Sequence, residues 1–474
     1  MKFGRLAHDT TVRHRAPPSF HRFRVTAAYL LGLYALSSCN VIVDTGTDQC
    51  QVHRECQAKA GVDNAPGAFC NAHHVCEVAR CTTTPECSAL LGEPSYCRPD
   101  RTCARLLTDK CFDVYPPDAL TQPDLVLFGF MAPLRNEADS GYGTPLMEGV
   151  ELALFEIEQN NHGIPSITGA ATRTPRHLGM LVCEHGNRAE KEHIETARHL
   201  IKDVGVPAIV GPAFSGFTLD VFDDVAYPNH TLVLSPSATS PVISGRTDDD
   251  NLLWRTAPSD VEQAETLKWL VAEIKHALPN ASTPVAAPIV AMTVKQDPAG
   301  LGLQAAATTS NLAIDDESKR APPMLPDVPA IIYPDQATSE QYAQAYNALM
   351  ANPPNIVVAL GTDEFVRELL PRIESDWEQR GNGMPRPWYL LPEGDRTDAL
   401  LKFATDPLNA RYRIDQRVLG TAPGARRYPG FQGFSARFAS LFQHPPGNLA
   451  EFAYDAAYLL AYSIVYTGVA HPTG

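Results

Sequence analysis

Each of three short loops places a hydroxyl or a carboxylate directly after an apolar, strand-like segment. The loops are residues 211–216, 235–239 and 392–394, and their polar side chains include Ser215, Thr239 and Glu393. A carboxylate at the first loop would meet the Ser215 hydroxyl, free backbone N–H groups and the positive end of a helix dipole. Glu393 offers a full negative charge to an ammonium group, and Thr239 offers a hydroxyl. Because a buried zwitterion needs partners at both ends, the loops predict a site for a small molecule with both groups.

Apolar segments alternate with helical patterns from residue 124 onward. We expect strands at 125–130, 178–183, 208–210 and 232–234, then at 289–294, 330–333, 356–360 and 388–391. We expect helices at 146–158, 189–204 and 218–226, then at 261–276, 301–312, 341–350 and 364–374. Such alternation is typical of parallel α/β sheets, which bind ligands at the carboxyl ends of their strands. Two of the loops end strands of the first series and one ends a strand of the second, which predicts a cleft between two lobes.

The N-terminal residues resemble an export signal. A basic stretch, 1–24, is followed by an apolar run, 25–36, and by Leu36-Ser37-Ser38-Cys39. This order is typical of a signal peptide that ends in a lipobox, so we expect cleavage before Cys39 and a lipid anchor on it. The run is too short to span a membrane, and no later segment reaches the roughly 18 apolar residues that a spanning helix needs. Asn40 replaces the aspartate that retains some lipoproteins at the inner membrane, which favours the outer membrane.

Cysteine spacing indicates an oxidising compartment. If Cys39 carries lipid, an even number of the 11 cysteines remains, which suits disulfides. Eight of them form two copies of one pattern, namely Cys50, Cys56, Cys70 and Cys76, then Cys81, Cys87, Cys97 and Cys103. Such small repeats bury little apolar surface, so disulfides worth roughly 2–4 kcal/mol each must stabilise them. We expect each repeat to close on itself, with three connectivities open for each, and Cys111 to pair with Cys183.

Zinc is the alternative explanation for the cysteines. His73 and His74 stand close to Cys76, and histidine is a common zinc ligand. The spacing of five residues within each cysteine pair is longer than zinc-binding loops favour. We therefore expect disulfides, no bound metal and no cofactor.

Composition and motifs exclude several classes of function. The formal net charge is −15 although the leader is basic, so nucleic acid is not an expected partner. The sequence contains no Gly-x-Ser-x-Gly, His-Glu-x-x-His or Gly-x-x-x-x-Gly-Lys-Ser/Thr motif. His185 stands at a strand end, but no nucleophile is fixed beside it in sequence. Catalysis is therefore not expected.

From about Asp124 to its end, the chain resembles the type I periplasmic binding proteins, in particular the leucine/isoleucine/valine-binding receptors of ABC transporters. The Ser-Pro-Gly-Ala-Thr loop of that family is matched by residues 235–239, with Ser237 in place of glycine, and its Gly-Pro-Glu-Gly loop by residues 391–394. Trp254-Arg255-Thr256 matches the hinge, and residues 454–457 resemble a late helix. The resemblance implies two doubly wound parallel-sheet lobes joined by a hinge.

The resemblance also implies roles for individual residues. Tyr142, before Gly143, would line the ligand side chain, and Ser215 would hold the ligand carboxylate. Ala238 and Thr239 would hold the carboxylate and the amino group, and Glu393 would pair with the ammonium group.

The chain departs from the family in the second lobe. In the family, tyrosines close over an aliphatic side chain of the ligand. This chain has Pro298-Ala299 and Thr362-Asp363 at those positions. The residues expected to bind the ammonium and carboxylate groups of the ligand are retained. The tyrosines expected to surround an aliphatic side chain are not. Asp363 could favour a polar or cationic side chain, or it could be a solvated loop acid.

These observations predict five parts. They are a signal peptide at 1–38, cysteine-rich disulfide repeats at 39–115, a first lobe at 122–257, a second lobe at 258–420, and a return to the first lobe at 421–474 that looks truncated beside the family. Two functions remain open at this point. The first is a solute-binding lipoprotein that captures an amino acid or related small ligand for an ABC permease. The second is a ligand sensor or surface interaction protein whose cysteine repeats bind a partner.

Overall fold

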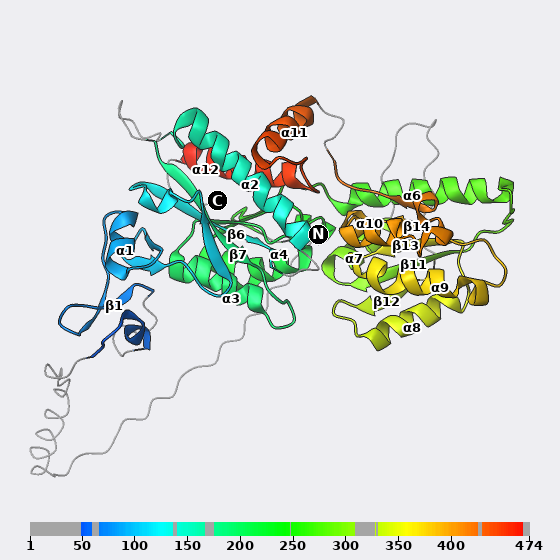
Figure 1. The fold of residues 1–474 in the computed structure, drawn as a ribbon, viewed down its shortest axis with the longest axis horizontal. Coiled ribbons are helices and arrows are strands. Elements are labelled where there is room, and N and C mark those ends of the chain that lie inside the picture. The colour runs from blue at the N-terminus through cyan, green and yellow to red at the C-terminus, as the bar shows by residue number, and fades with distance from the viewer. Residues whose placement is uncertain are drawn as a thin grey trace, which may run out of the picture. The chain divides into compact units, whose positions relative to one another are not determined.

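The structure is a computed structural model that describes residues 49–58, 66–135, 140–165, 175–246, 248–308, 328, 330–424 and 429–467 (Figure 1). The expected signal peptide and the lipidation site Cys39 lie outside the described residues. Among the helices of the described part, none is long and apolar enough to cross a membrane.

The first lobe is built on a six-stranded sheet with the strand order β10-β9-β8-β6-β7-β5. Its strands are β5 (Cys111–Tyr115), β6 (Leu125–Ala132), β7 (His177–Glu184), β8 (Ala208–Val210), β9 (Leu232–Ser235) and β10 (Leu253–Arg255). All eight residues of the central strand β6 are buried. A strand covered on both faces needs apolar residues at every position, which is why this segment lacks the alternation of a half-exposed strand.

Helices cover both faces of this sheet. They are α2 (Ser140–Asn161), α3 (Glu192–Arg198), α4 (Ser215–Val221), α5 (Pro241–Ser244), α11 (Pro429–Phe442) and α12 (Ala450–Thr467). One core joins α2 and α12 to Phe128 and Phe130, and a second core joins α3 and the π-helical turns 199–204 and 222–226 to Leu127 and Met131. Helices on both faces confirm the expected doubly wound lobe.

The edge strand β5 corrects the expectation of purely parallel sheets. It pairs antiparallel with β7, with Cys111 opposite Cys183, and these two cysteines form a disulfide. Residues 111–115 were expected to end the cysteine-rich region. They instead form the edge strand of the first-lobe sheet, where β5 hydrogen-bonds to β7.

The second lobe has a five-stranded parallel sheet with the order β12-β11-β13-β14-β15. Its strands are β11 (Val290–Gln296), β12 (Ala330–Pro334), β13 (Ile356–Leu360), β14 (Trp388–Leu391) and β15 (Val418–Gly420). Its helices are α6 (Asp260–Ala277), α7 (Pro298–Thr308), α8 (Ser339–Met350), α9 (Leu370–Arg380) and α10 (Asp398–Thr405). Helices α8 and α9 cover one face of the sheet, while α6 and α7 cover the other.

The end of the described chain returns to the first lobe. Helix α12 packs along α2, and a Cβ on Gly149 of α2 would lie 2.2 Å from the carbonyl oxygen of Ala450. Only glycine allows this approach of the two backbones. At the crossing between lobes, the Thr256 hydroxyl donates to the carbonyl of Phe452 at 2.8 Å.

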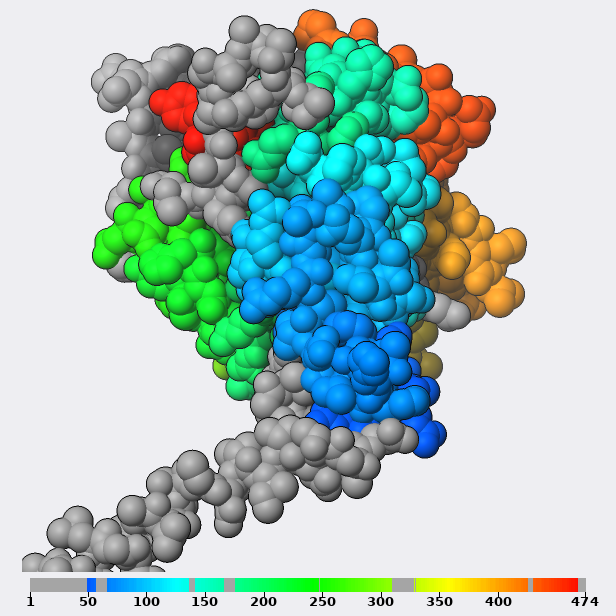
Figure 2. All heavy atoms as spheres, turned by 90° about the vertical axis from the view of Figure 1, so that its left-hand side faces the viewer, coloured from blue at the N-terminus to red at the C-terminus, as the bar shows by residue number. Residues whose placement is uncertain are grey.

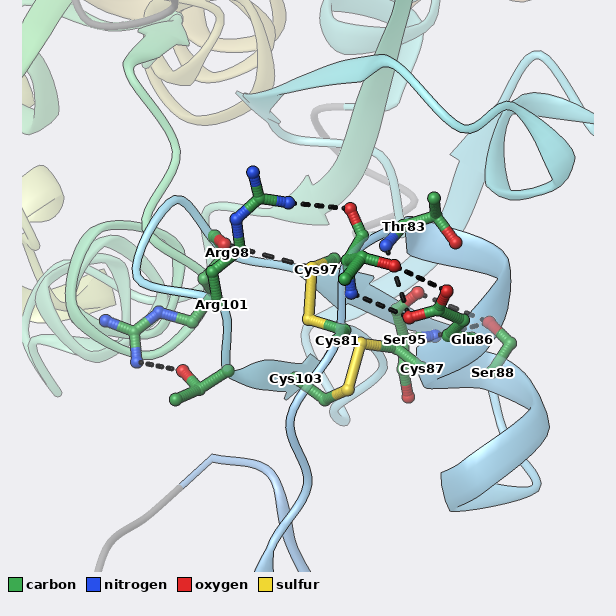
Figure 3. The surroundings of a disulfide bond; sticks show 12 residues. Cys81, Thr83, Glu86, Cys87, Ser88, Ser95, Cys97, Arg98, Arg101 and Cys103 are labelled. Atoms are coloured by element: carbon green, nitrogen blue, oxygen red, sulfur yellow. Dashed lines mark hydrogen bonds between the residues drawn. A yellow bond between two sulfur atoms is a disulfide. The ribbon is translucent and has the colours of Figure 1, made fainter.

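The cysteine-rich region forms two small modules, each with one hairpin. The first contains β1 (Ala68–Cys70) and β2 (Cys76–Val78), and the second contains α1 (Thr84–Leu91), β3 (Ser95–Cys97) and β4 (Cys103–Arg105). The disulfides join Cys50 to Cys70, Cys56 to Cys76, Cys81 to Cys97 and Cys87 to Cys103. Each repeat therefore closes on itself, as expected, and these sulfurs are engaged in disulfides (Figure 3).

The second module packs against the first lobe. Tyr96 and Leu106 belong to the same core as Leu127 of β6, and the imidazole of His199 hydrogen-bonds the carbonyl of Leu106 at 3.0 Å. In Figure 2 the cysteine-rich residues, in blue, directly border the first-lobe residues in cyan. The module is part of the folded body and not a separate stalk.

Candidate ligand-binding cleft

A cavity of about 660 Å³ is lined by residues of both lobes. The lining residues follow the carboxyl ends of β7, β8 and β9 in the first lobe and of β11, β12, β13 and β14 in the second. This is the place where parallel α/β sheets bind ligands. The cleft predicted from the loop positions is therefore present.

Most of the predicted site residues line this cavity. Tyr142, Ser215, Ser237, Thr239 and Glu393 are among the lining residues. Ala238, which was expected to hold a carboxylate, does not line the cavity.

Ala238 is buried beneath the cavity wall. Its backbone N–H donates to the Ser235 hydroxyl at 3.1 Å, so the group expected to hold the carboxylate is already used inside the first lobe. The Ser237 hydroxyl, at the position of the family's glycine, donates to the carbonyl of Ala213 at 2.7 Å.

Glu393 is almost fully buried, and polar groups from two other elements reach it. The Thr239 hydroxyl donates to its Oε1 atom at 3.4 Å, and the Gln263 amide donates to its Oε2 atom. Burial raises the pKa of Glu393, and these hydrogen bonds offset part of that rise. Burial and the charge of Glu393 also raise the pKa of Tyr142.

Asp260 is a second buried carboxylate in the cavity wall, and sequence reasoning missed it. It is the first residue of α6, it is 2% exposed, and its backbone N–H donates to the carbonyl of Thr239 at 2.9 Å. Burial and the charge of Glu393 raise its pKa. An acid in the first turn of a helix is ordinarily explained by the helix dipole, so only its place after the hinge could have indicated a site.

The first turn of α4 supplies hydrogen-bond donors to the cavity. The N-cap residue Phe214 provides no side-chain cap, so the first N–H groups of the helix are left for another acceptor. Ser215 and Gly216 begin this turn and line the cavity, and the Ser215 hydroxyl accepts from the N–H of Ser240 at 3.2 Å. A Cβ on Gly216 would lie 2.7 Å from the guanidinium carbon of Arg188. Glycine therefore lets a cation lie against this turn.

Aromatic side chains form one wall of the cavity in the first lobe. The rings of Tyr142 and Phe214 lie 5.1 Å apart, and His185 stacks on Phe217 at 4.1 Å. Burial, with smaller effects from His193 and Lys110, lowers the pKa of His185 to about 3. His185 is thus a neutral, buried part of this wall, and it lies in the loop that follows β7.

A charged network joins the two lobes across the cavity. Arg188 of the first lobe contacts Asp335 of the second at 2.9 Å, and Asp335 also contacts Lys295 at 3.2 Å. Lys295 lies 3.6 Å from Asp297 and 3.9 Å from Glu364. Sequence reasoning named none of these residues, because Arg188 and Asp335 are 147 residues apart and Lys295 meets Asp335 and Glu364 only in the folded sheet.

The positions that depart from the resembled family carry small or polar residues at the cavity. Ala299, Thr362 and Asp363 line the cavity. Asp363 is 6% exposed and pairs with Arg367 at 2.8 Å, so it is not a solvated loop acid. The wall that would surround an aliphatic side chain is replaced by charged and small residues.

The segment between the cysteine modules and β5 also contributes to the cavity wall. Lys110 forms an ion pair with Glu192 at 2.6 Å, and its carbonyl accepts from the N–H of Glu184 at 2.8 Å. The carbonyl of Asp109 accepts from the Arg135 guanidinium at 3.0 Å. Both Asp109 and Lys110 line the cavity.

Comparison with known proteins shows the fold but no family. No family model matches the chain. A curated relative, the chemotactic signal transduction system substrate-binding protein BasB of Halobacterium salinarum, is 35% identical over 86 residues, which are 18% of this chain and 21% of that protein. The matched segment thus spans about a fifth of that relative.

Solved structures match most of the chain. The leucine binding protein LivK of Thermotoga maritima has a TM-score of 0.50 and 16% identity. The match covers 73% of this chain and 84% of the LivK chain. A solute binding protein of an ABC transporter of R. palustris, in complex with 4-hydroxybenzoate, has a TM-score of 0.52, 13% identity and coverages of 74% and 83%. A possible leucine/isoleucine/valine-binding protein from Rhodopirellula baltica has a TM-score of 0.50, 17% identity and coverages of 74% and 83%.

The chain has the type I periplasmic binding protein fold. These solved structures are described as binding proteins for small solutes, and none is described as an enzyme. The fold class expected from the sequence is therefore confirmed, with the antiparallel strand β5 as an addition.

Proposed function

We propose that this protein is an extracytoplasmic solute-binding protein that captures one small ligand with an ammonium and a carboxylate group, such as an amino acid. One observation carries the proposal: an inter-lobe cavity at the strand ends holds the buried Glu393 and the uncapped first turn of α4. The carboxylate of Glu393 would pair with the ammonium group, and the N–H groups near Ser215 would hold the carboxylate.

Delivery to an ABC permease is the proposed use of the captured ligand. Two of the similar structures are described as a leucine binding protein and as a solute-binding protein of an ABC transporter. The charged network around Lys295 supports a ligand with a polar side chain, because an aliphatic one would leave these groups without their water.

Ligand sensing is the second candidate function, and two observations favour it. The second cysteine module packs on the first lobe, and the adjoining segment with Lys110 lines the cavity. The matched segment of BasB belongs to a protein named for chemotactic signal transduction. A partner bound to the cysteine modules could therefore respond to ligand in the cleft.

Lipid anchoring through Cys39 is part of the proposal. The lipobox and the disulfides favour a mature chain attached to the cell envelope, with the outer membrane preferred because of Asn40. Mass spectrometry of the mature N-terminus tests this, since an uncleaved or unmodified Cys39 would rule the anchor out.

A thermal-shift screen of amino acids, amides and small peptides tests ligand capture. A ligand that binds only the folded protein raises its melting temperature, by an amount that grows with concentration above Kd. We expect stabilisation by at least one amino acid. Stabilisation by none of them would contradict the proposal and favour the partner-binding function.

A further inference from the structure

Asp260 and Glu393 are two buried carboxylates joined by one residue. The Thr239 hydroxyl donates to Glu393 and the Thr239 carbonyl accepts from the N–H of Asp260. Asp260 is 2% exposed and Glu393 is 7% exposed, and both line the cavity. Two acids at one place are costly to bury unless a cation joins them.

Gln263 adds an acceptor without a partner. Its amide nitrogen donates to Glu393, while its Oε1 atom is buried and has no hydrogen-bond partner. Gln263 lies one turn after Asp260 on α6 and lines the same cavity. A buried acceptor of this kind costs free energy that a ligand N–H group would recover.

The other charges around the pair do not replace a ligand cation. Tyr142, Arg255, Asp297 and Asp395 are the remaining titratable groups whose charges act on Asp260, on Glu393 or on both. Among these groups of the described residues, Arg255 is the cation.

The guanidinium of Arg255 is already engaged in the hinge region. It donates to the carbonyl of Ser240 at 2.7 Å and to the hydroxyl of Ser244 at 2.5 Å. Asp297, for its part, is paired with Lys295.

Building on the proposed function, we propose that Asp260 and Gln263 complete a primary-ammonium site with Glu393 and Thr239, and that ligand capture displaces a proton held by the two carboxylates. A primary ammonium group offers three N–H donors. Glu393, Asp260 and the free Gln263 oxygen are three acceptors for them. A hydroxyl or an anion offers no matching charge, so the site selects against both.

The proton release follows from the burial of two neighbouring carboxyl groups. Burial raises the pKa of both carboxyl groups, and the charge of Glu393 raises that of Asp260 further. The pair therefore keeps a proton at a pH where exposed acids are ionised. An ammonium group favours the fully ionised pair, so affinity should rise with pH by up to about tenfold per unit while one proton is exchanged.

Calorimetry with matched ligands tests the proposal. The probes are L-serine with glycerate, and L-aspartate with malate, in which a hydroxyl replaces the ammonium group; 4-hydroxybenzoate serves as an anion without one. Each is titrated into the full chain in two buffers of different ionisation enthalpy. We expect binding of an amino acid at least about 100-fold tighter than of its hydroxy acid, with release of about one proton per ligand.

Two variants test whether weaker binding results from loss of the ammonium site or from a general loss of folding. Asp260→Asn should weaken amino-acid binding at least tenfold and abolish the proton release, and Gln263→Leu should weaken binding without abolishing it. Glu262→Gln removes an exposed charge from the same turn of α6 and should change neither quantity. Melting temperature in the absence of ligand monitors folding.

The outcomes distinguish this inference from the proposed function. Amino-acid binding with no proton release and full affinity in Asp260→Asn would overturn the inference while the proposed function stands. Tighter binding of glycerate, malate or 4-hydroxybenzoate than of the amino acids would overturn the ammonium site itself. If neither these probes nor any compound of the thermal-shift screen binds, both proposals fail.

Discussion

Glu393 is the residue on which ligand capture should depend most. Glu393→Gln keeps the size of the side chain but leaves a ligand ammonium group with less counter-charge in a closed cleft, which should cost about 2–5 kcal/mol of binding free energy. Ser215→Ala should cost less, about 1–3 kcal/mol, because the N–H groups of α4 remain. Calorimetric Kd values measure both. Glu378→Gln is the control, since that side chain is 83% exposed, and equal losses in all three variants would contradict the assignment.

His185 should make the protein sensitive to acid. Its pKa is about 3 in the folded protein and about 6.5 when exposed, so the unfolded chain binds the additional proton between these values. Stability should therefore be fully present above about pH 6.5 and fall as the pH drops, by about 2 kcal/mol at pH 5 from this residue alone. Urea unfolding of wild type and His185→Gln at both pH values measures the effect. A pH dependence that is unchanged in the variant would contradict it.

The sequence indicated the residues whose chemistry is local and missed those whose role depends on distant partners. Ser215, Thr239 and Glu393 each follow an apolar strand, and this position could be read directly from the chain. Asp260 opens an ordinary amphipathic helix, and its meaning comes from Glu393, more than 100 residues later. The role of Ala238 stays a prediction, and the sequence could not show that its N–H donates to the Ser235 hydroxyl.

The loops after β7 and β12 form the principal ion-pair connection between the lobes that borders the cleft. Asp335 contacts Arg188 of the first lobe and Lys295 of the second, so it favours the arrangement in which the cleft is closed. Asp335→Asn should favour opening and weaken ligand binding by about fivefold, which corresponds to about 1 kcal/mol. Calorimetry measures the affinity, and small-angle scattering of the ligand-free protein measures the opening.

A matched control separates closure from a general charge effect. Asp223 pairs with Arg246 within the first lobe, so Asp223→Asn removes an ion pair that does not cross the cleft. We expect its affinity to equal that of wild type. Equal weakening in both variants would show that the connection between the lobes is not the cause.

The predicted strands were correct where the sequence has uninterrupted apolar runs. The expected strands 125–130, 208–210 and 356–360 correspond to β6, β8 and β13, because fully buried parallel strands form uninterrupted apolar runs. The helix expected at 146–158 spans Ser140–Asn161 and contains Pro145 in its second turn. Strand β5 was missed because it has only five residues and its partner β7 is some 70 residues away.

Residues 109–115 connect the cysteine modules to the first lobe and to the cavity. This segment carries Asp109 and Lys110 at the cavity wall, and then forms β5 with Cys111 bonded to Cys183. The sequence could suggest this disulfide from parity, but it could not show that the neighbouring residues reach the ligand cleft. That conclusion requires the pairing of β5 with β7.

Removal of two different disulfides should therefore have different consequences. The pair Cys111→Ala and Cys183→Ala opens a link with a sequence separation of 72 and frees β5, so we expect a stability loss of about 2–4 kcal/mol. Because Lys110 precedes Cys111, the same variant should also bind the amino acid that the thermal-shift screen identifies several-fold more weakly. Urea unfolding and calorimetry measure the two effects.

The comparison variant is the pair Cys87→Ala and Cys103→Ala, which opens a disulfide with a separation of 16 inside the second module. Its loss should unfold part of that module, because the cysteines form the centre of its small core together with Ala79 and Leu91. The β5 and β7 pairing and the Lys110 ion pair with Glu192 do not depend on this disulfide. Ligand affinity should therefore stay within about twofold of wild type, a difference of less than 0.5 kcal/mol. A comparable loss of affinity in both variants would show that the module as a whole, and not the 109–115 segment, supports the cleft.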